Sequence, residues 1–183
     1  MRHFAIIDTE TNWSDQVMSI GTVIADADTF SVTAVKYHVL PKECEICGMF
    51  SDSLFLDIPF SPVLCNRSEA IEELKAWFAG FGVTKVFAYN ANFDRSHLPE
   101  LKNYQWFDIM RLAAYRQYNP CIPDCAECFS TGRLKRGYGV EPMLRMLSGK
   151  TRYRETHNAV LDALDELSIM RLLAIPISQY IPL

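Results

Sequence analysis

The stretch His3–Thr11, HFAIIDTET, decides how the rest of the chain is interpreted. Its first part is apolar and rich in β-forming residues, which predicts a buried strand. Side chains alternate along a strand, so Asp8 and Glu10 point to one face and Thr9 points to the other. Two neighbouring carboxylates at the end of a buried strand repel each other unless a cation lies between them. Such hard oxygen ligands favour magnesium or manganese. A strand end that runs out into solvent is the competing interpretation.

The elements that follow predict a sheet with helices packed on it. Two more strands, residues 17–26 and 30–40, are separated by the polar sequence ADADT, which suits a hairpin. Further strands are expected at residues 85–89 and 105–107. Helices are expected at residues 68–80 with Ser68 as N-cap, within 90–104, at 108–118 capped by Asp108, at 141–148 with Pro142 in the first turn, and at 158–174. A meander followed by strand–helix alternation predicts an α/β fold with a mixed five-stranded sheet and helices on both faces.

Length and composition are those of one globular domain spanning residues 1–183. The chain is 49% hydrophobic and 22% charged, with a net charge of −4. The net charge is negative, so the protein as a whole does not attract nucleic acid, although a local basic patch would be enough to bind it. The apolar run at the N-terminus is too short for a signal peptide. No apolar run approaches the length of a membrane span, which is about 18 residues. With six cysteines and no export signal, we expect a cytoplasmic protein without disulfides.

Two further acids lie at the starts of predicted helices. Asp94 ends the sequence NANFD (residues 90–94), and alone it resembles a first-turn acid favoured by the helix dipole. Asp162 alone would be an ordinary exposed helix acid. Asp165 and Glu166 follow it at i+3 and i+4, so they share its side of the helix and compete with it for any role.

Taken together, these pieces resemble a known family. DTET on the first strand, NANFD after a later strand, and His157-x4-Asp162 at the last helix resemble the three motifs of the DEDDh 3′→5′ exonucleases. That family has a ribonuclease H-like fold and includes proofreading subunits of DNA polymerases, oligoribonuclease and ribonuclease T. The sequences DIMRLAA (108–114) and RYRETHNAVLDA (152–163) are also similar to the family.

The resemblance implies a function and the residues that perform it. Asp8, Glu10, Asp94 and Asp162 would hold two magnesium or manganese ions about 3.5–4 Å apart, while Asp165 does not fit the His-x4-Asp spacing. His157 would act as general base, since an imidazole with a pKa of about 6.5 accepts a proton close to neutral pH. The expected reaction is hydrolysis of single-stranded DNA or RNA from its 3′ end, with a polymerase or replication protein as a further partner. The choice between DNA and RNA and the oligomeric state stay open.

Two other functions compete with this hypothesis. A catalytically silent domain could bind nucleic acid through the same groove, although all five motif residues are present. An adaptor that depends on zinc is the second alternative. It would use the pairs Cys44-x2-Cys47 and Cys125-x2-Cys128, each of which resembles half of a four-thiolate zinc site. The pairs are far apart in the sequence, so the fold would have to bring them together, and unliganded loop cysteines are the simpler interpretation.

Basic and aromatic residues alternate shortly before His157. The sequences RLKRGYG (133–139) and KTRYR (150–154) place cations among tyrosines, which suits phosphate binding combined with base stacking. A solvated basic surface fits the pattern equally well. The nucleic-acid contacts predicted from these segments and from the motif neighbourhoods are Thr9, Thr11, Asn90, Arg133, Lys135, Arg136 and Arg154.

Overall fold

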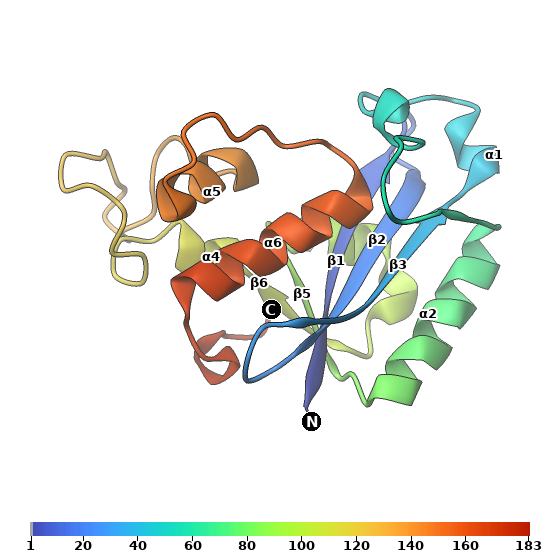
Figure 1. Ribbon diagram of the computed structural model, residues 1–183, viewed down its shortest axis with the longest axis horizontal. Coiled ribbons are helices and arrows are strands. Elements are labelled where there is room, and N and C mark those ends of the chain that lie inside the picture. Colours follow the sequence, from blue (N-terminus) through green and yellow to red (C-terminus); the bar gives the residue numbers. More distant parts are fainter. Residues whose placement is uncertain (1) are drawn as a thin grey trace.

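The computed structural model describes residues 2–183, and within them one mixed six-stranded sheet forms the centre of the molecule (Figure 1). The strands are β1 (His3–Thr11), β2 (Val17–Asp26), β3 (Val32–Val39), β4 (Val63–Leu64), β5 (Lys85–Ala88) and β6 (Gln105–Asp108). Their order across the sheet is β4-β3-β2-β1-β5-β6. β1, β2 and β3 form an antiparallel meander, whereas β5 and β6 run parallel to β1. The predicted meander followed by strand–helix units is confirmed.

The sheet has one strand more than the sequence predicted. β4 contains only two residues and pairs in parallel with the end of β3, at His38 and Val39. It lies in the irregular region after β3, and two residues are too few to show a strand periodicity. β4 forms because the tertiary fold places Val63 and Leu64 beside the edge of β3.

Hydrophobic core residues lie on both faces of the sheet. On one face, α2 (Arg67–Phe81) packs against Ala5 and Ile7 of β1. On the other face, α6 (Ala159–Leu173) packs against Phe4 and Ile6. The alternation of side chains along β1 therefore supplies both cores, and the prediction of helices on both faces is confirmed. The remaining helices are α1 (Pro41–Cys44), α3 (Asn92–His97), α4 (Met110–Ala113) and α5 (Val140–Ser148), with 3₁₀ turns at Ser51–Ser53, Pro99–Leu101 and Ile177–Gln179.

Two helix starts differ from the prediction because their caps differ. α2 is capped by Asn66 instead of Ser68, since the Asn66 side chain accepts from the Glu69 N–H while the Glu69 carboxylate accepts from the Asn66 N–H. α5 is capped by Gly139, which places Pro142 at the third helical position instead of the first. An N–H is unpaired at either position, so proline is tolerated at both.

The helix predicted at residues 108–118 is only the four-residue α4. Asp108 ends β6, and its Oδ1 accepts from the backbone N–H groups of Met110 and Asn90, each at 3.0 Å. Asp108 thus supports the start of α4 and also holds the turn after β5. The chain then leaves the helix because Tyr115 pairs with Arg133 across the following loop.

The start of α6 lies unusually close to the sheet. Gly21 of β2 pairs with Asp8 of β1, and a Cβ added at Gly21 would stand 2.0 Å from the carbonyl oxygen of Ala159. Only a residue without a side chain allows this approach. The first turn of α6 is thereby brought beside the end of β1. Among residues 2–183, no helix is long and apolar enough to cross a membrane.

Candidate active site

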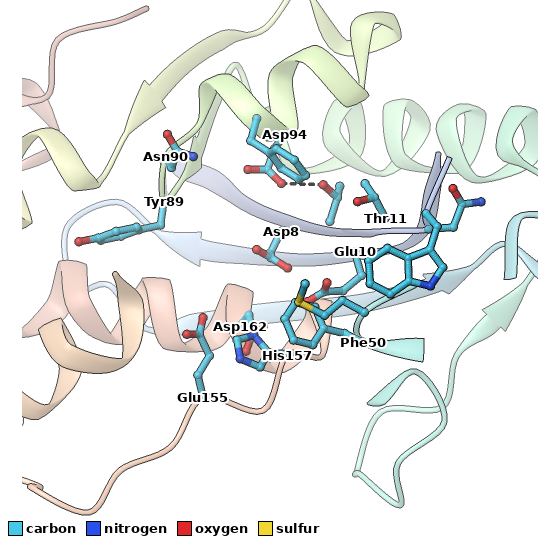
Figure 2. A pocket seen from close by; sticks show the side chains of 15 residues that line it. Asp8, Glu10, Thr11, Phe50, Tyr89, Asn90, Asp94, Glu155, His157 and Asp162 are labelled. Atoms are coloured by element: carbon cyan, nitrogen blue, oxygen red, sulfur yellow. Dashed lines mark hydrogen bonds between the residues drawn. The ribbon is translucent and has the colours of Figure 1, made fainter. Parts of the chain in front are cut away.

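A pocket of about 340 Å³ lies where β1 ends and where α3 and α6 begin (Figure 2). Three separate parts of the sequence supply its polar lining: Asp8 and Glu10 on β1, Asp94 on α3, and His157 and Asp162 at the start of α6. Side chains of Glu10, Asp94 and Asp162 are 8%, 2% and 3% exposed. The tertiary structure therefore gathers four acids and one histidine in a largely buried space.

Asp94 is oriented by a residue of the opposite strand face. The Thr9 hydroxyl donates to Asp94 Oδ1 at 2.8 Å, and both side chains are buried. Strand side chains alternate, so Thr9 points away from Asp8 and Glu10, and its hydrogen bond holds the Asp94 side chain of α3 at the end of β1. Figure 2 shows Asp8, Glu10 and Asp94 around the same pocket. Burial nevertheless raises the pKa of Asp94 to about 7, although the bond from Thr9 acts to lower it.

The other three acids also hold their protons more tightly than free carboxylates. Burial raises the pKa of Asp8 well above its usual value, and the nearby charge of Asp94 raises it further. Burial, followed by the charge of Glu155, raises the pKa of Glu10 to about 8 and that of Asp162 to about 9. The pocket therefore holds more negative charge than its surroundings compensate.

These residues fit a divalent cation. Glu10, His157 and Asp162 each place one ligand atom within 4.8 Å of the others. Asp8 Oδ2 and Asp162 Oδ1 are buried without a hydrogen-bond partner, and no Lys or Arg of residues 2–183 lines the pocket. A buried carboxylate without a partner is costly, and hard oxygen atoms of this kind bind magnesium or manganese.

His157 is fixed by the segment that follows β3. Its ring stacks on Phe50, with centroids 3.9 Å apart and planes 15° from parallel, and its carbonyl accepts from the Ser53 hydroxyl. The backbone of His157 has φ +55°, an uncommon value for a non-glycine residue. Burial lowers the pKa of His157, so the ring is neutral near pH 7.

The cap of α6 is Asn158, which leaves the His157 side chain free for another role. Asn158 Oδ1 accepts from the Leu161 N–H at 3.4 Å. Its amide nitrogen donates to the Ser53 carbonyl at 2.7 Å. His157 therefore does not cap the helix, because its neighbour Asn158 fills that position.

The three acids of α6 have three different environments. Asp162 lines the pocket. Asp165 accepts from the Tyr153 hydroxyl outside it. Glu166 is 1% exposed, and its Oε2 has no partner within the described residues. Of these three acids, only Asp162, the one predicted from the His-x4-Asp spacing, lines the pocket.

Sequence reasoning missed seven residues that line the pocket: Asn12, Trp13, Met49, Phe50, Tyr89, Phe93 and Glu155. Trp13 and Met49 are each 68% exposed, which leaves an apolar rim around the acids. Glu155 lies in the motif segment, but nothing in its spacing singled it out. Phe50 belongs to the irregular region after β3, where no periodicity indicated which side chains turn inward.

No protein-family model matches the sequence, and no curated protein matches it by sequence. Solved structures do match its fold. The nuclease domain of 3′hExo, a DEDDh family member bound to rAMP, superposes with a TM-score of 0.64 at 13% identity, covering 99% of this chain and 96% of that one. The chain has the DEDDh exonuclease fold.

Two further structures with this fold were solved with nucleic acid. E. coli exonuclease I in complex with a dA16 oligonucleotide has a TM-score of 0.59 at 14% identity. The alignment covers 98% of this chain but only 42% of exonuclease I. A 3′-exonuclease that recognises the histone mRNA stem-loop has a TM-score of 0.61 at 11% identity, covering 99% of this chain and 70% of that one. At such identities the likeness concerns the fold alone.

On this DEDDh exonuclease fold the predicted nucleic-acid contacts divide into two groups. Thr9, Thr11 and Asn90 line the pocket. The basic residues Arg133, Lys135, Arg136 and Arg154 do not line it. Arg154 instead forms an ion pair with Glu141 at 3.1 Å.

The four-thiolate zinc site is wrong for this fold. Within the described part of the chain, the only group of three or more metal-binding side chains is the one in the pocket, and it contains no cysteine. Cys44 and Cys47 lie at and just after α1, whereas Cys125 and Cys128 lie in the loop between α4 and α5 at the opposite end of the molecule (Figure 1). The sheet separates these regions, so the cysteines stay free thiols.

Proposed function

We propose that this protein is a metal-dependent 3′→5′ exonuclease that hydrolyses single-stranded nucleic acid. One observation carries the proposal: the pocket joins residues of all three motifs, from β1, from α3 and from the start of α6. Complexes of exonucleases with the same fold and bound oligonucleotides support it.

Different residues of the pocket have different roles in phosphodiester hydrolysis. Divalent cations held by Asp8, Glu10, Asp94 and Asp162 would activate water and neutralise charge on the phosphate. The neutral imidazole of His157 accepts the proton of the attacking water. Phe50 fixes the plane of that imidazole by stacking.

The rim of the pocket favours an unpaired strand end. Trp13 and Phe93 are both exposed there and offer aromatic faces on which bases stack without sequence preference. A base must leave its duplex to stack in this way. Single strands are therefore the better substrates.

The test is hydrolysis of single-stranded DNA and RNA oligonucleotides labelled at the 5′ end or at the 3′ end. With magnesium or manganese, we expect the 5′ label to appear in a ladder of progressively shorter products and the 3′ label to be released at once in mononucleotides. Chelation with EDTA should stop both. A 5′ label released first would contradict the assigned direction, and oligonucleotide binding without metal-dependent hydrolysis would favour the silent domain.

A further inference from the structure

An aromatic and basic surface lies outside the pocket, in the loop between α4 and α5. The guanidinium carbon of Arg133 is 4.9 Å from the centre of the Phe129 ring and 5.4 Å from that of Tyr138. Phe129 is 46% exposed and Tyr138 39%. Arg133 stacks on aromatic rings and forms no ion pair within residues 2–183, so the N–H groups along its edge are available for a phosphate.

Two more cations extend this surface. Lys135 and Arg136 are exposed, and neither forms an ion pair with any described residue. The same loop carries the acids Asp124 and Glu127, which also remain unpaired. With Arg116, the loop has four cations against two acids and therefore two positive charges in excess, and three of its cations lie in the part of the loop that leads into α5.

The loop holds this surface in a fixed shape. The backbone N–H of Phe129 donates to the Arg133 carbonyl at 2.8 Å, and Arg133 also pairs with Tyr115. Arg116 anchors the loop by donating to three carbonyls, those of Pro123, Asp124 and Ala126. A binding surface already ordered in this way loses little conformational entropy when a ligand arrives.

The surface begins at one wall of the pocket. Tyr89 lines the pocket, and its hydroxyl donates to the backbone carbonyl of Tyr138. A pocket of about 340 Å³ is at the small end of ligand sites, so it holds a nucleotide-sized group and leaves the rest of a strand outside. A strand that leaves past Tyr89 meets Tyr138 and Arg133 next.

We propose that Phe129, Arg133, Lys135, Arg136 and Tyr138 form a second nucleic-acid subsite, which binds the body of a single strand whose 3′ end occupies the pocket. This inference rests on the proposed function. The cations would contact phosphates, and the two exposed rings would stack on bases. Affinity should therefore increase with strand length until the strand spans both sites.

The test measures binding of fluorescein-labelled oligothymidylate and oligouridylate, from 2 to about 12 nucleotides, by fluorescence anisotropy in EDTA, where no turnover occurs. The test variant is the triple substitution Arg133→Ala, Lys135→Ala, Arg136→Ala. The control is Lys75→Ala, Lys102→Ala, Arg171→Ala, which removes the same charge from exposed positions elsewhere. We expect the test variant to bind the 12-mer at least about 10-fold more weakly, with dinucleotide binding unchanged. The slope of log affinity against log salt should fall by about 2 for three lost phosphate contacts.

Aromatic variants separate stacking from charge. Tyr138→Phe should keep the affinity for the 12-mer, and Tyr138→Leu should lose about 5-fold or more. Equal weakening in the test and control triples would overturn the subsite, as would a 12-mer that binds no more tightly than a dinucleotide. These results are independent of hydrolysis. A protein that degrades oligonucleotides but fails this test would keep the proposed function and lose the second subsite.

Discussion

At the residue scale, Asp8 shows that the acids of the pocket repel one another and need a cation to balance their charge. Its pKa is raised by burial and by four neighbouring carboxylates, and one of its oxygens has no hydrogen-bond donor. The carboxylate lies on a strand that pairs with β2 along its length, and an asparagine in its place has nearly the same volume, so that substitution opens no cavity.

Asp8→Asn should abolish hydrolysis and leave the fold intact. Loss of a ligand should lower turnover by more than about 10²-fold, which is the upper range for outer-shell changes at metal sites. In EDTA the variant should melt no lower than the wild type, because one repelling charge is gone. Turnover and melting temperature measured together test this, and near wild-type turnover would remove Asp8 from the metal site.

His157→Ala should lower turnover by about 10²–10⁴-fold, because positioned proton transfer is lost. The variant should still bind metal, because all four acids remain. The pKa of His157 is lowered, so the wild-type rate should rise with pH through a value below about 6.5, and the variant should lack that rise. His3→Ala is the matched control, since His3 lies at the other end of β1, where its ring bonds to the Phe81 carbonyl. A variant with reduced stability but normal turnover would exclude the general base role.

At the scale of elements, the pocket depends on how closely α6 approaches β2. Asp162 is in the first turn of that helix, and Gly21 opposite it has no side chain. Asp8 pairs with Gly21 across the two strands, so the same glycine sets the distance between the acids of β1 and the acid of α6.

Gly21→Ala should therefore reduce activity as well as stability. The new methyl group would meet the backbone of Ala159, which cannot move without shifting α6. Overpacking of this kind costs about 1–3 kcal/mol. Gly80→Ala is the control: it lies in α2, meets nothing within 4 Å, and should be neutral or stabilising by up to about 1 kcal/mol. Thermal unfolding and turnover of both variants test the idea, and a fully active Gly21→Ala protein would contradict it.

At the scale of the whole molecule, the buried acids couple stability to pH and to metal. The pKa values of Glu10, Asp94 and Asp162 are raised to about 8, 7 and 9, above those of the unfolded chain. Between roughly pH 4 and pH 9 the native state therefore binds more protons than the unfolded state, and the free energy of unfolding falls as pH rises.

The metal-free protein should consequently melt at progressively lower temperature from about pH 5 to pH 9. Added magnesium or manganese should raise the melting temperature, and most strongly at high pH, because the cation replaces the bound protons. Melting curves across this range, with EDTA or with metal, provide the measurement. The same pH dependence with and without metal would mean that these acids do not bind it.

The sequence alone determined the features that depend on neighbouring residues. Strand alternation placed Asp8 and Glu10 on one face. Asn158 and Ala174 cap the two ends of the last helix, at the boundaries that the sequence predicted. The succession of a meander and strand–helix units along the chain was also predicted, and motif spacing selected Asp162 over Asp165. These properties are local because each is fixed by backbone geometry over a few residues.

Only the tertiary structure decided which distant side chains meet. It stacked Phe50 on His157, turned Glu155 into the pocket and separated Cys47 from Cys125. These residues lie in irregular segments, whose path is set by the surfaces they cover and not by a repeating pattern. The electrostatics were likewise beyond the sequence. A carboxylate has an ordinary pKa until packing removes its water and brings other charges beside it, and that requires the whole fold.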